Sequence, residues 1–285
     1  MAAAIAVSTA VSKQSILLHR PLSLALNLST RESDPPLVLY AYKESESVRG
    51  NIKFSLEQGL HGSADFIFIL DGETDIADLI PTRDDVRIIQ RLNICFDLDT
   101  FGEVLREDDL WKRYKRFITM NASLRGPFMP YWSTGCRSDT YLECVTGDVK
   151  LATDRIGMKS LLYLPAKASQ PDIYGIVNNT VAFGSYYEEF HQAIHAEIGA
   201  TGVIRGAGYK VSAMMSAFQG QQYFDECDKY PKDLLVDGSY FGTNLHPYET
   251  IFSKANRGID LPTLDLLTRL HLSGQQNQSW ELCQR

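Results

Sequence analysis

The sequence lacks the features that mark several classes of protein. Its five cysteines contain no Cys-x-x-Cys pair and no metal-ligand spacing, which argues against a dithiol redox motif and a zinc ribbon. Lys and Arg are scattered and the formal net charge is -7, so no basic surface for nucleic acid or for an anionic membrane is expected. No run of 18 apolar residues occurs, so no membrane-spanning helix is predicted.

Acidic residues are absent from the first 31 positions, which contain Lys13, Arg20 and Arg31 among Ser and small apolar residues. This composition is typical of a leader or processing segment, and residues 1–34 are therefore placed outside the fold. A short signal peptide, a degraded anchor and membrane association all stay open. The sequons at Asn27, Asn121, Asn178 and Asn277 matter only if the chain enters the secretory pathway.

The first half of the chain alternates strand and helix patterns. Strand patterns lie at 37–42, 66–70, 86–89 and 117–120, the first two of which are continuous apolar runs, and helical patterns lie at 46–60 and 100–113. Such runs are typical of strands that are covered on both faces. The alternation predicts an α/β fold with a mainly parallel sheet and helices on both faces.

The second half is less regular. We expect helices near 154–162, 188–205 and 264–272 and a strand at 209–214. With 285 residues, of which 44% are hydrophobic, one domain is favoured. We assign it to 35–260, followed by a C-terminal helix and tail at 261–285.

Cys136 and Cys144 could form a disulfide, although the number of cysteines is odd.

Polar residues follow several of the predicted strands. The fourth strand ends in Asn121, Ser123 and Arg125, and the second ends in Asp71-Gly72-Glu73. Ligands of parallel sheets bind at the carboxyl ends of the strands, so these side chains are candidates for a binding crevice. The alternative is that Asn, Ser and Asp-Gly only form turns.

The segments 117–128, 131–133 and 93–105 together resemble a group of glycosyltransferases found in fungi and plants, and more distantly bacterial rhamnan-synthesis-type glycosyltransferases. The resemblance extends from about Leu37 to Asp260 and implies a nucleotide-sugar-binding fold of the GT-A kind. It also implies that Asp97, Asn121, Ser123 and Arg125 position a nucleotide-sugar donor. Asp71 and Glu73 match the group's acidic turn and are possible accessory residues.

Two further segments resemble the same group. In 195–211, the resemblance implies that Glu197, eleven residues before Gly208, is the base that deprotonates an acceptor hydroxyl. In 240–257, it implies that Lys254 and Arg257 neutralise the leaving diphosphate. The alternatives are a solvated helix residue and ordinary surface cations. His195, His246 and Glu249 are possible accessory residues of these segments.

Metal binding is weakly indicated. Asp97-Leu98-Asp99 has the spacing of a metal-binding Asp-x-Asp, but Asp99 departs from the resembling pattern and is interpreted as a helix N-cap. Glu188, His191 and His195 share a helix face, and a surface cluster is favoured over a zinc site. No metal ligand is assigned, and Mn²⁺ or Mg²⁺ stays open as a cofactor.

One junction departs from the resembling group. Leu151 and Ala152 join directly where those proteins have an additional loop and strand, and a strand that runs straight into the helix expected at 154–162 is physically awkward. A lost segment there would put activity in doubt.

We therefore weigh two functions. The first is a hexosyl- or deoxyhexosyltransferase that moves a sugar from a nucleotide donor to a glycan or other hydroxyl acceptor by inverting displacement. The second is a catalytically degenerate protein that only binds nucleotide or glycan. A Golgi or endoplasmic-reticulum lumen suits the reaction and the sequons.

Overall fold

A computed structural model describes residues 34–155, 158–163, 183–184, 187–218, 233–274 and 279–283. The expected leader therefore lies outside the described residues, except for Asp34. Cys227 and the sequons at Asn27, Asn178 and Asn277 lie outside them too. No helix among the described residues is long and apolar enough to cross a membrane.

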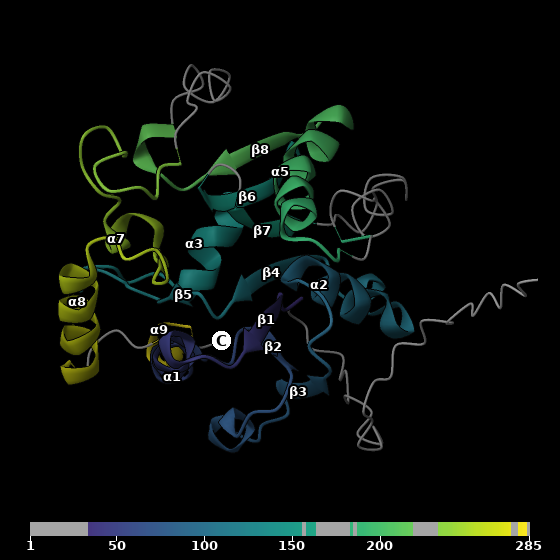
Figure 1. Cartoon of the computed structure of the whole chain (residues 1–285), viewed down its shortest axis with the longest axis horizontal. Coiled ribbons are helices and arrows are strands. Elements are labelled where there is room, and N and C mark those ends of the chain that lie inside the picture. Colours follow the sequence, from purple (N-terminus) through teal and green to yellow (C-terminus); the bar gives the residue numbers. More distant parts are fainter. Residues whose placement is uncertain are drawn as a thin grey trace, which may run out of the picture.

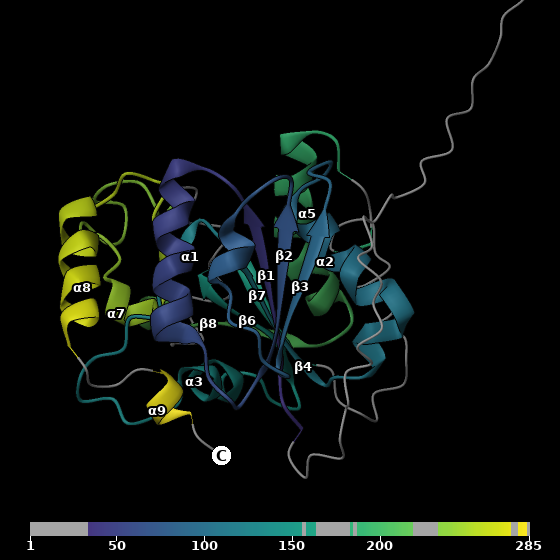
Figure 2. The same cartoon turned by 90° about the horizontal axis from the view of Figure 1, so that it is seen from below.

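A seven-stranded sheet forms the centre of the molecule (Figures 1 and 2). Its order is β3 (Val86–Arg91), β2 (Asp65–Asp71), β1 (Leu37–Lys43), β4 (Arg116–Asn121), β7 (Met158–Tyr163), β6 (Val149–Arg155) and β8 (Lys210–Ala213). The first four strands are parallel. β7 is antiparallel to both its neighbours, and β8 is parallel to β6. The predicted α/β class with a mainly parallel sheet is confirmed.

Helices cover both faces of the sheet, as Figure 2 shows. Helix α1 (Glu46–Gly59) and α3 (Arg137–Glu143) lie on one face, and α2 (Asp97–Arg106) and α5 (Phe190–Gly206) lie on the other. Alternate residues of β1 serve the two faces: Leu39 joins the core under α2 and α5, and Tyr40 joins the core under α1. Each of the first six residues of β1 is buried. This explains its continuous apolar run, because both faces of the strand are packed.

Short elements complete the fold. A second sheet pairs β5 (Leu124–Arg125) with β9 (Ser253–Lys254). Helix α8 (Leu261–Ser273) packs on α1 through a core in which Leu264 and Leu267 meet Phe54 and Phe128. The remaining elements are η1 (Ile76–Leu79), η2 (Glu107–Lys112), η3 (Ser216–Phe218), α7 (Pro247–Thr250) and α9 (Ser279–Leu282).

The helix expected at 154–162 is wrong, because this segment belongs to the antiparallel strands β6 and β7. Arg155 pairs with Met158, so only Ile156 and Gly157 separate the strands. A two-residue connection that contains Gly is typical of a hairpin. Leu151 and Ala152 both lie within β6. The awkward strand-to-helix junction therefore does not exist, and no segment needs to be missing there.

Helix α2 begins at Asp97 and ends at Arg106, so the expected helix at 100–113 started three residues late and ended too late. Asp108 and Asp109 have positive φ angles, which interrupt the helix. Asp99 is the third helical residue and not the N-cap, which is Phe96. Its carboxylate Oδ2 nevertheless supports the helix start by accepting the backbone N–H of Phe96 at 3.2 Å.

The described cysteines pair differently from the expected Cys136–Cys144 bond. Cys136 forms a disulfide with Cys283, 147 residues away in the sequence, and Cys144 and Cys95 are free. Cys144 lies at the C-terminal cap of α3, whereas Cys136 caps the N-terminus of that helix beside the end of the chain. The disulfide therefore attaches the segment after α9 to the body of the protein.

Candidate functional site

The order of the parallel strands fixes the place of a crevice. From β1 the chain continues to β2 and β3 on one side, and β4 then lies on the other side of β1. This reversal is a topological switch point, where open α/β sheets bind ligands at the carboxyl ends of the strands. The residues that follow β1 and β4 therefore border the candidate site, together with the start of α2.

Asp97, Asn121 and Ser123 form a hydrogen-bonded chain at this edge. The Asn121 amide Nδ2 donates to Asp97 Oδ2 at 2.6 Å, and the Ser123 hydroxyl donates to Asn121 Oδ1 at 2.6 Å. Asn121 is the last residue of β4 and Asp97 is the first of α2. The backbone N–H of Ala122 bonds to Ala41 at 3.0 Å, which holds the segment against β1. Three predicted donor-binding residues thus meet at the switch point.

A second, buried group lies at the ends of β2 and β3. Arg91 is 4% exposed, and its guanidinium donates to Thr100 Oγ1 at 2.5 Å and to Glu103. Its Nη1 lies 3.5 Å from Asp71 Oδ1. Asp71, predicted as an accessory residue, is therefore part of a salt-bridged group that fastens α2 to the sheet. Glu73, two residues later, is exposed.

Two carboxylates near this edge are buried without complete pairing. Burial raises the pKa of Asp71 to about 7, despite the opposing charge of Arg91. Burial also raises the pKa of Asp99 to about 7, although Asp99 accepts the backbone N–H of Tyr187 at 3.1 Å. One oxygen of each carboxyl, Oδ1, has no hydrogen-bond partner. Both groups can therefore change protonation near neutral pH.

Glu44, the residue after β1, is a polar residue at this edge to which the sequence analysis gave no role. Its Oε2 accepts hydrogen bonds from the Tyr42 hydroxyl at 2.9 Å, Arg49 at 2.9 Å and Thr74 at 2.7 Å. Desolvation opposes the shift, but the bonds from Thr74, Tyr42 and Arg49 hold the pKa of Glu44 below its usual value. Lys43, the exposed last residue of β1, precedes this cluster.

Helix α5 starts at the same edge of the sheet. β8 runs parallel to β6, and β6 runs parallel to β4 because both are antiparallel to β7. Since α5 connects directly to β8, its N-terminus lies at the carboxyl edge. The ring centroids of Phe190, its first residue, and Phe96 are 6.3 Å apart. Glu197 lies roughly 10 Å further along the helix axis, two turns below the edge.

Glu197 interrupts an apolar stripe. Ala193, Ala196, Ala200 and Ile204 of α5 pack on the sheet, and residue 197 shares their side of the helix by its i+4 and i−3 spacing. The carboxylate is half-buried, and its Oε1 is shielded from water with no hydrogen-bond partner. One of its two oxygens is therefore out of reach of solvent, and the role of Glu197 stays a prediction.

The predicted cations have different surroundings. Arg125 donates to Asn51 Oδ1 at 2.7 Å and to Asp265 Oδ1 at 2.8 Å, so it joins β5 to α1 and α8. Lys254 pairs with Leu124 across the small sheet, and the backbone N–H of the residue after it donates to the carbonyl of Ser123. It also lines a pocket between α7 and α8. Arg257 forms an ion pair with Asp233 at 3.3 Å, and both side chains are exposed.

Two of the remaining predicted residues, His246 and Glu249, accept hydrogen bonds from other residues of the protein. His246 caps α7 by accepting the Tyr248 N–H at 3.2 Å. Glu249 Oε1 accepts the Ser216 N–H at 2.7 Å and the Tyr240 hydroxyl. His195 is exposed on α5.

Metal ligands do not converge in the crevice. Among the described residues, the only group of three or more Asp, Glu, His or Cys ligand atoms close enough to share an ion is His61, Cys136 and Cys283, which lies away from the ends of β1 and β4. Asp97 and Asp99 are committed to different partners. The crevice carboxylates thus show no converging ligand set for Mn²⁺ or Mg²⁺, and that cofactor stays an untested expectation.

Comparisons with known proteins give only distant likenesses. No protein-family model and no curated protein match the sequence, so the fungal and plant group stays a prediction. The chain is similar to the apo-form glycosyltransferase GlyE of Streptococcus pneumoniae TIGR4, with 13% identity and a TM-score of 0.36 over 62% of this chain and 44% of GlyE. It therefore spans less than half of the length of GlyE.

Two further solved structures are similar to the chain, with equally low identities and TM-scores. A cytidylyltransferase from Leptospira borgpetersenii serovar Hardjo-bovis (strain JB197) has 11% identity and a TM-score of 0.40 over 84% of this chain and 95% of that one. A 4-diphosphocytidyl-2C-methyl-D-erythritol synthase has 10% identity and a TM-score of 0.34 over 67% and 91%. Likenesses of this size do not assign an activity to the chain.

Proposed function

We propose that this protein is a transferase that binds a nucleotide-sugar donor and passes the sugar to an acceptor hydroxyl. The observation that carries the proposal is the chain of hydrogen bonds through Asp97, Asn121 and Ser123 at the switch point between β1 and β4. Carboxylate, amide and hydroxyl groups are suited to the hydroxyls of a ribose or a sugar. In the comparable crevice of dinucleotide-binding folds, an acidic residue accepts a ribose hydroxyl.

The proposed chemistry is a single displacement with inversion. Glu197 would take the proton of the acceptor hydroxyl, whose oxygen forms the new bond to the anomeric carbon as the bond to the nucleoside diphosphate breaks. The place of Glu197 supports this role, because it is on the sheet-facing side of α5, the helix that begins at the carboxyl edge of the sheet. Lys254 would stabilise the departing diphosphate.

The proposal also covers the cellular compartment in which the protein acts. We place the protein in the lumen of the secretory pathway, in the Golgi or endoplasmic reticulum. The Cys136–Cys283 disulfide supports an oxidising compartment. Glycans on Asn27 or Asn277 of protein isolated from its native cells would support it further, and unmodified asparagines at both positions would argue against it.

Donor binding can be measured by thermal shift against nucleoside diphosphate sugars, with and without Mn²⁺. A donor at about a hundred times its Kd stabilises the folded chain by about 2.7 kcal/mol, which raises the melting temperature by roughly 5–10 °C. Asp97→Ala and Asn121→Ala should lose this shift. Glu57→Ala removes an exposed carboxylate from the end of α1 far from the crevice and should keep it. An undiminished shift in Asn121→Ala would remove the crevice from the proposal.

Turnover separates binding from catalysis. Glu197→Gln should keep the donor-induced shift and lose sugar transfer, because the amide cannot accept the proton. Equal transfer by this variant would overturn the base assignment but not the donor site.

Two observations favour the rival function, a protein that binds donor or glycan without turnover. Arg257, predicted to neutralise the diphosphate, is paired with Asp233, and Glu197 lies two turns below the crevice edge. The rival predicts a donor-specific thermal shift together with no transfer to any acceptor. Transfer that depends on Glu197 would exclude it.

A further inference from the structure

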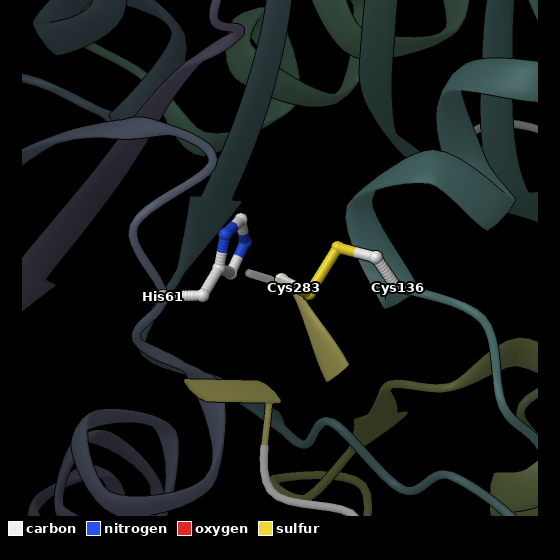
Figure 3. Close-up of side chains that lie close together, drawn as sticks. All are labelled: His61, Cys136 and Cys283. Carbon is white, nitrogen blue, oxygen red and sulfur yellow. A yellow bond between two sulfur atoms is a disulfide. The ribbon is translucent and has the colours of Figure 1, made fainter. Parts of the chain in front are cut away.

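Three buried side chains from distant parts of the sequence lie close together at the N-terminal end of α3. His61 lies between α1 and β2, Cys136 precedes α3, and Cys283 follows α9. Their exposed fractions are 0%, 7% and 2%. One imidazole nitrogen and the two sulfurs lie within 4.8 Å of one another, and Figure 3 shows the imidazole beside the two sulfur atoms. The two cysteines are joined as a disulfide.

The histidine is held firmly in this place. Its Nε2 is 2.8 Å from the hydroxyl of Ser138, which is buried, and its Nδ1 accepts the Ser63 N–H at 3.2 Å. Its ring packs edge-on against Phe66, with centroids 5.4 Å apart. The Ser63 hydroxyl bonds to the carbonyl of Cys283, so the segments that contribute His61 and Cys283 are also fastened to each other.

Two thiolates and an imidazole are the ligand set that zinc prefers, and three protein ligands leave a fourth position for water. We propose that the chain binds one Zn²⁺ through His61, Cys136 and Cys283 when the disulfide is reduced. Two thiolates, a neutral imidazole and Zn²⁺ sum to no net charge, which suits a buried place because an isolated charge is costly there. Zinc would use the lone pair of one imidazole nitrogen and leave the proton on the other, so Nδ1 would give up the Ser63 N–H. Ser138 would accept the proton of Nε2 or lie beside the open position.

The disulfide and the metal exclude each other. A dithiol reductant would exchange with the Cys136–Cys283 bond, becoming a disulfide itself and leaving two thiols on the protein. Zn²⁺ would then displace one proton from each thiol. In both states Cys283 is linked to Cys136 at the start of α3, through the disulfide when the cysteines are oxidised and through Zn²⁺ when they are reduced.

The test uses the full-length chain, oxidised or reduced, with Co²⁺ and Zn²⁺ as probes. The reduced chain should bind one Zn²⁺ by elemental analysis and show a thiolate-to-cobalt charge-transfer band with Co²⁺. The oxidised chain should do neither. Cys283→Ser should lose the band, and His61→Ala should weaken binding at least about tenfold, since even a supporting residue is worth about that much. Cys144→Ser changes a free, half-buried cysteine outside the site and should bind as the wild type does.

A second measurement does not depend on the variants folding. Zn²⁺ should protect two thiols of the reduced wild type from alkylation, and peptide mapping should identify them as Cys136 and Cys283. Protection of other cysteines, a cobalt band that persists in Cys283→Ser, or no metal uptake by a reduced chain that is folded would overturn the proposal.

Discussion

Asp99 should make the protein less stable as pH rises through the neutral range. Its carboxyl is 1% exposed, and burial raises its pKa from 3.8 to about 7. The folded state therefore binds the proton more tightly than the unfolded state does. The stabilising contribution of the protonated acid is complete below about pH 4 and is lost as pH rises to about 7 and beyond.

The magnitude follows from the shift. At about 1.4 kcal/mol for each pKa unit, ionisation of Asp99 costs the folded state about 4 kcal/mol. About 2 kcal/mol of this falls between pH 5 and pH 7. Asp99→Asn abolishes the titration, while its amide oxygen can still accept the N–H groups of Phe96 and Tyr187 that now bond to Oδ2.

Urea unfolding at several pH values measures the effect. Between pH 5 and pH 7, the free energy of unfolding of the wild type should fall by about 2 kcal/mol relative to Asp99→Asn. Burial raises the pKa of Asp71 to about 7 as well, but Asp71 is present in both proteins and its effect cancels in the difference. Asp84→Asn, which removes an exposed carboxylate, should follow the wild-type curve. A constant difference between wild type and Asp99→Asn across this range would refute the reasoning.

Two further substitutions test the packing of α2 and the attachment of the C-terminus. Gly102→Ala should destabilise the protein by more than about 2 kcal/mol, because its Cβ would clash with the carbonyl oxygen of Phe183. Gly50→Ala meets no atom within 4 Å in α1 and should stabilise the protein by up to about 1 kcal/mol. Urea midpoints that move together for the two variants would contradict this. Cys283→Ser should lower the unfolding free energy by about 2–5 kcal/mol under oxidising conditions with a chelator present, and reductant should bring the wild type down to the variant; equal midpoints without reductant would show that the bond to Cys136 adds no stability.

The parallel half of the sheet could be predicted because its signal is local. Strands β1, β2 and β4 are packed on both faces, so their sequences are mainly apolar, and polar residues follow them. The edge strand β3 is only partly buried. The pattern of apolar strands followed by polar residues led to Asn121 and Ser123, and the resemblance led to Asp97. It could not show that their side chains bond to one another, although strand ends of one parallel sheet must lie at one edge.

The errors arose where short apolar runs have no clear period. Residues 154–162 fit a helix as well as a strand by spacing, and the informative signal was the two-residue connection with Gly157. The Arg91 group was missed because Asp71 belongs to β2, whereas Thr100 and Glu103 belong to α2, and only packing brings them to Arg91. The partner of Cys136 could not be read from the sequence either, since spacing does not determine disulfide connectivity.

The pairing of β4 with β7 affects the order in which parts of the protein can fold during synthesis. The four parallel strands and their connecting helices α1 and α2 are complete once residue 121 has been made, whereas β7 begins at Met158. Until then β4 is an edge strand whose outer backbone groups have no partner. Such an edge can pair with another chain, so the nascent protein is most open to aggregation after the parallel half has formed and before the hairpin covers it.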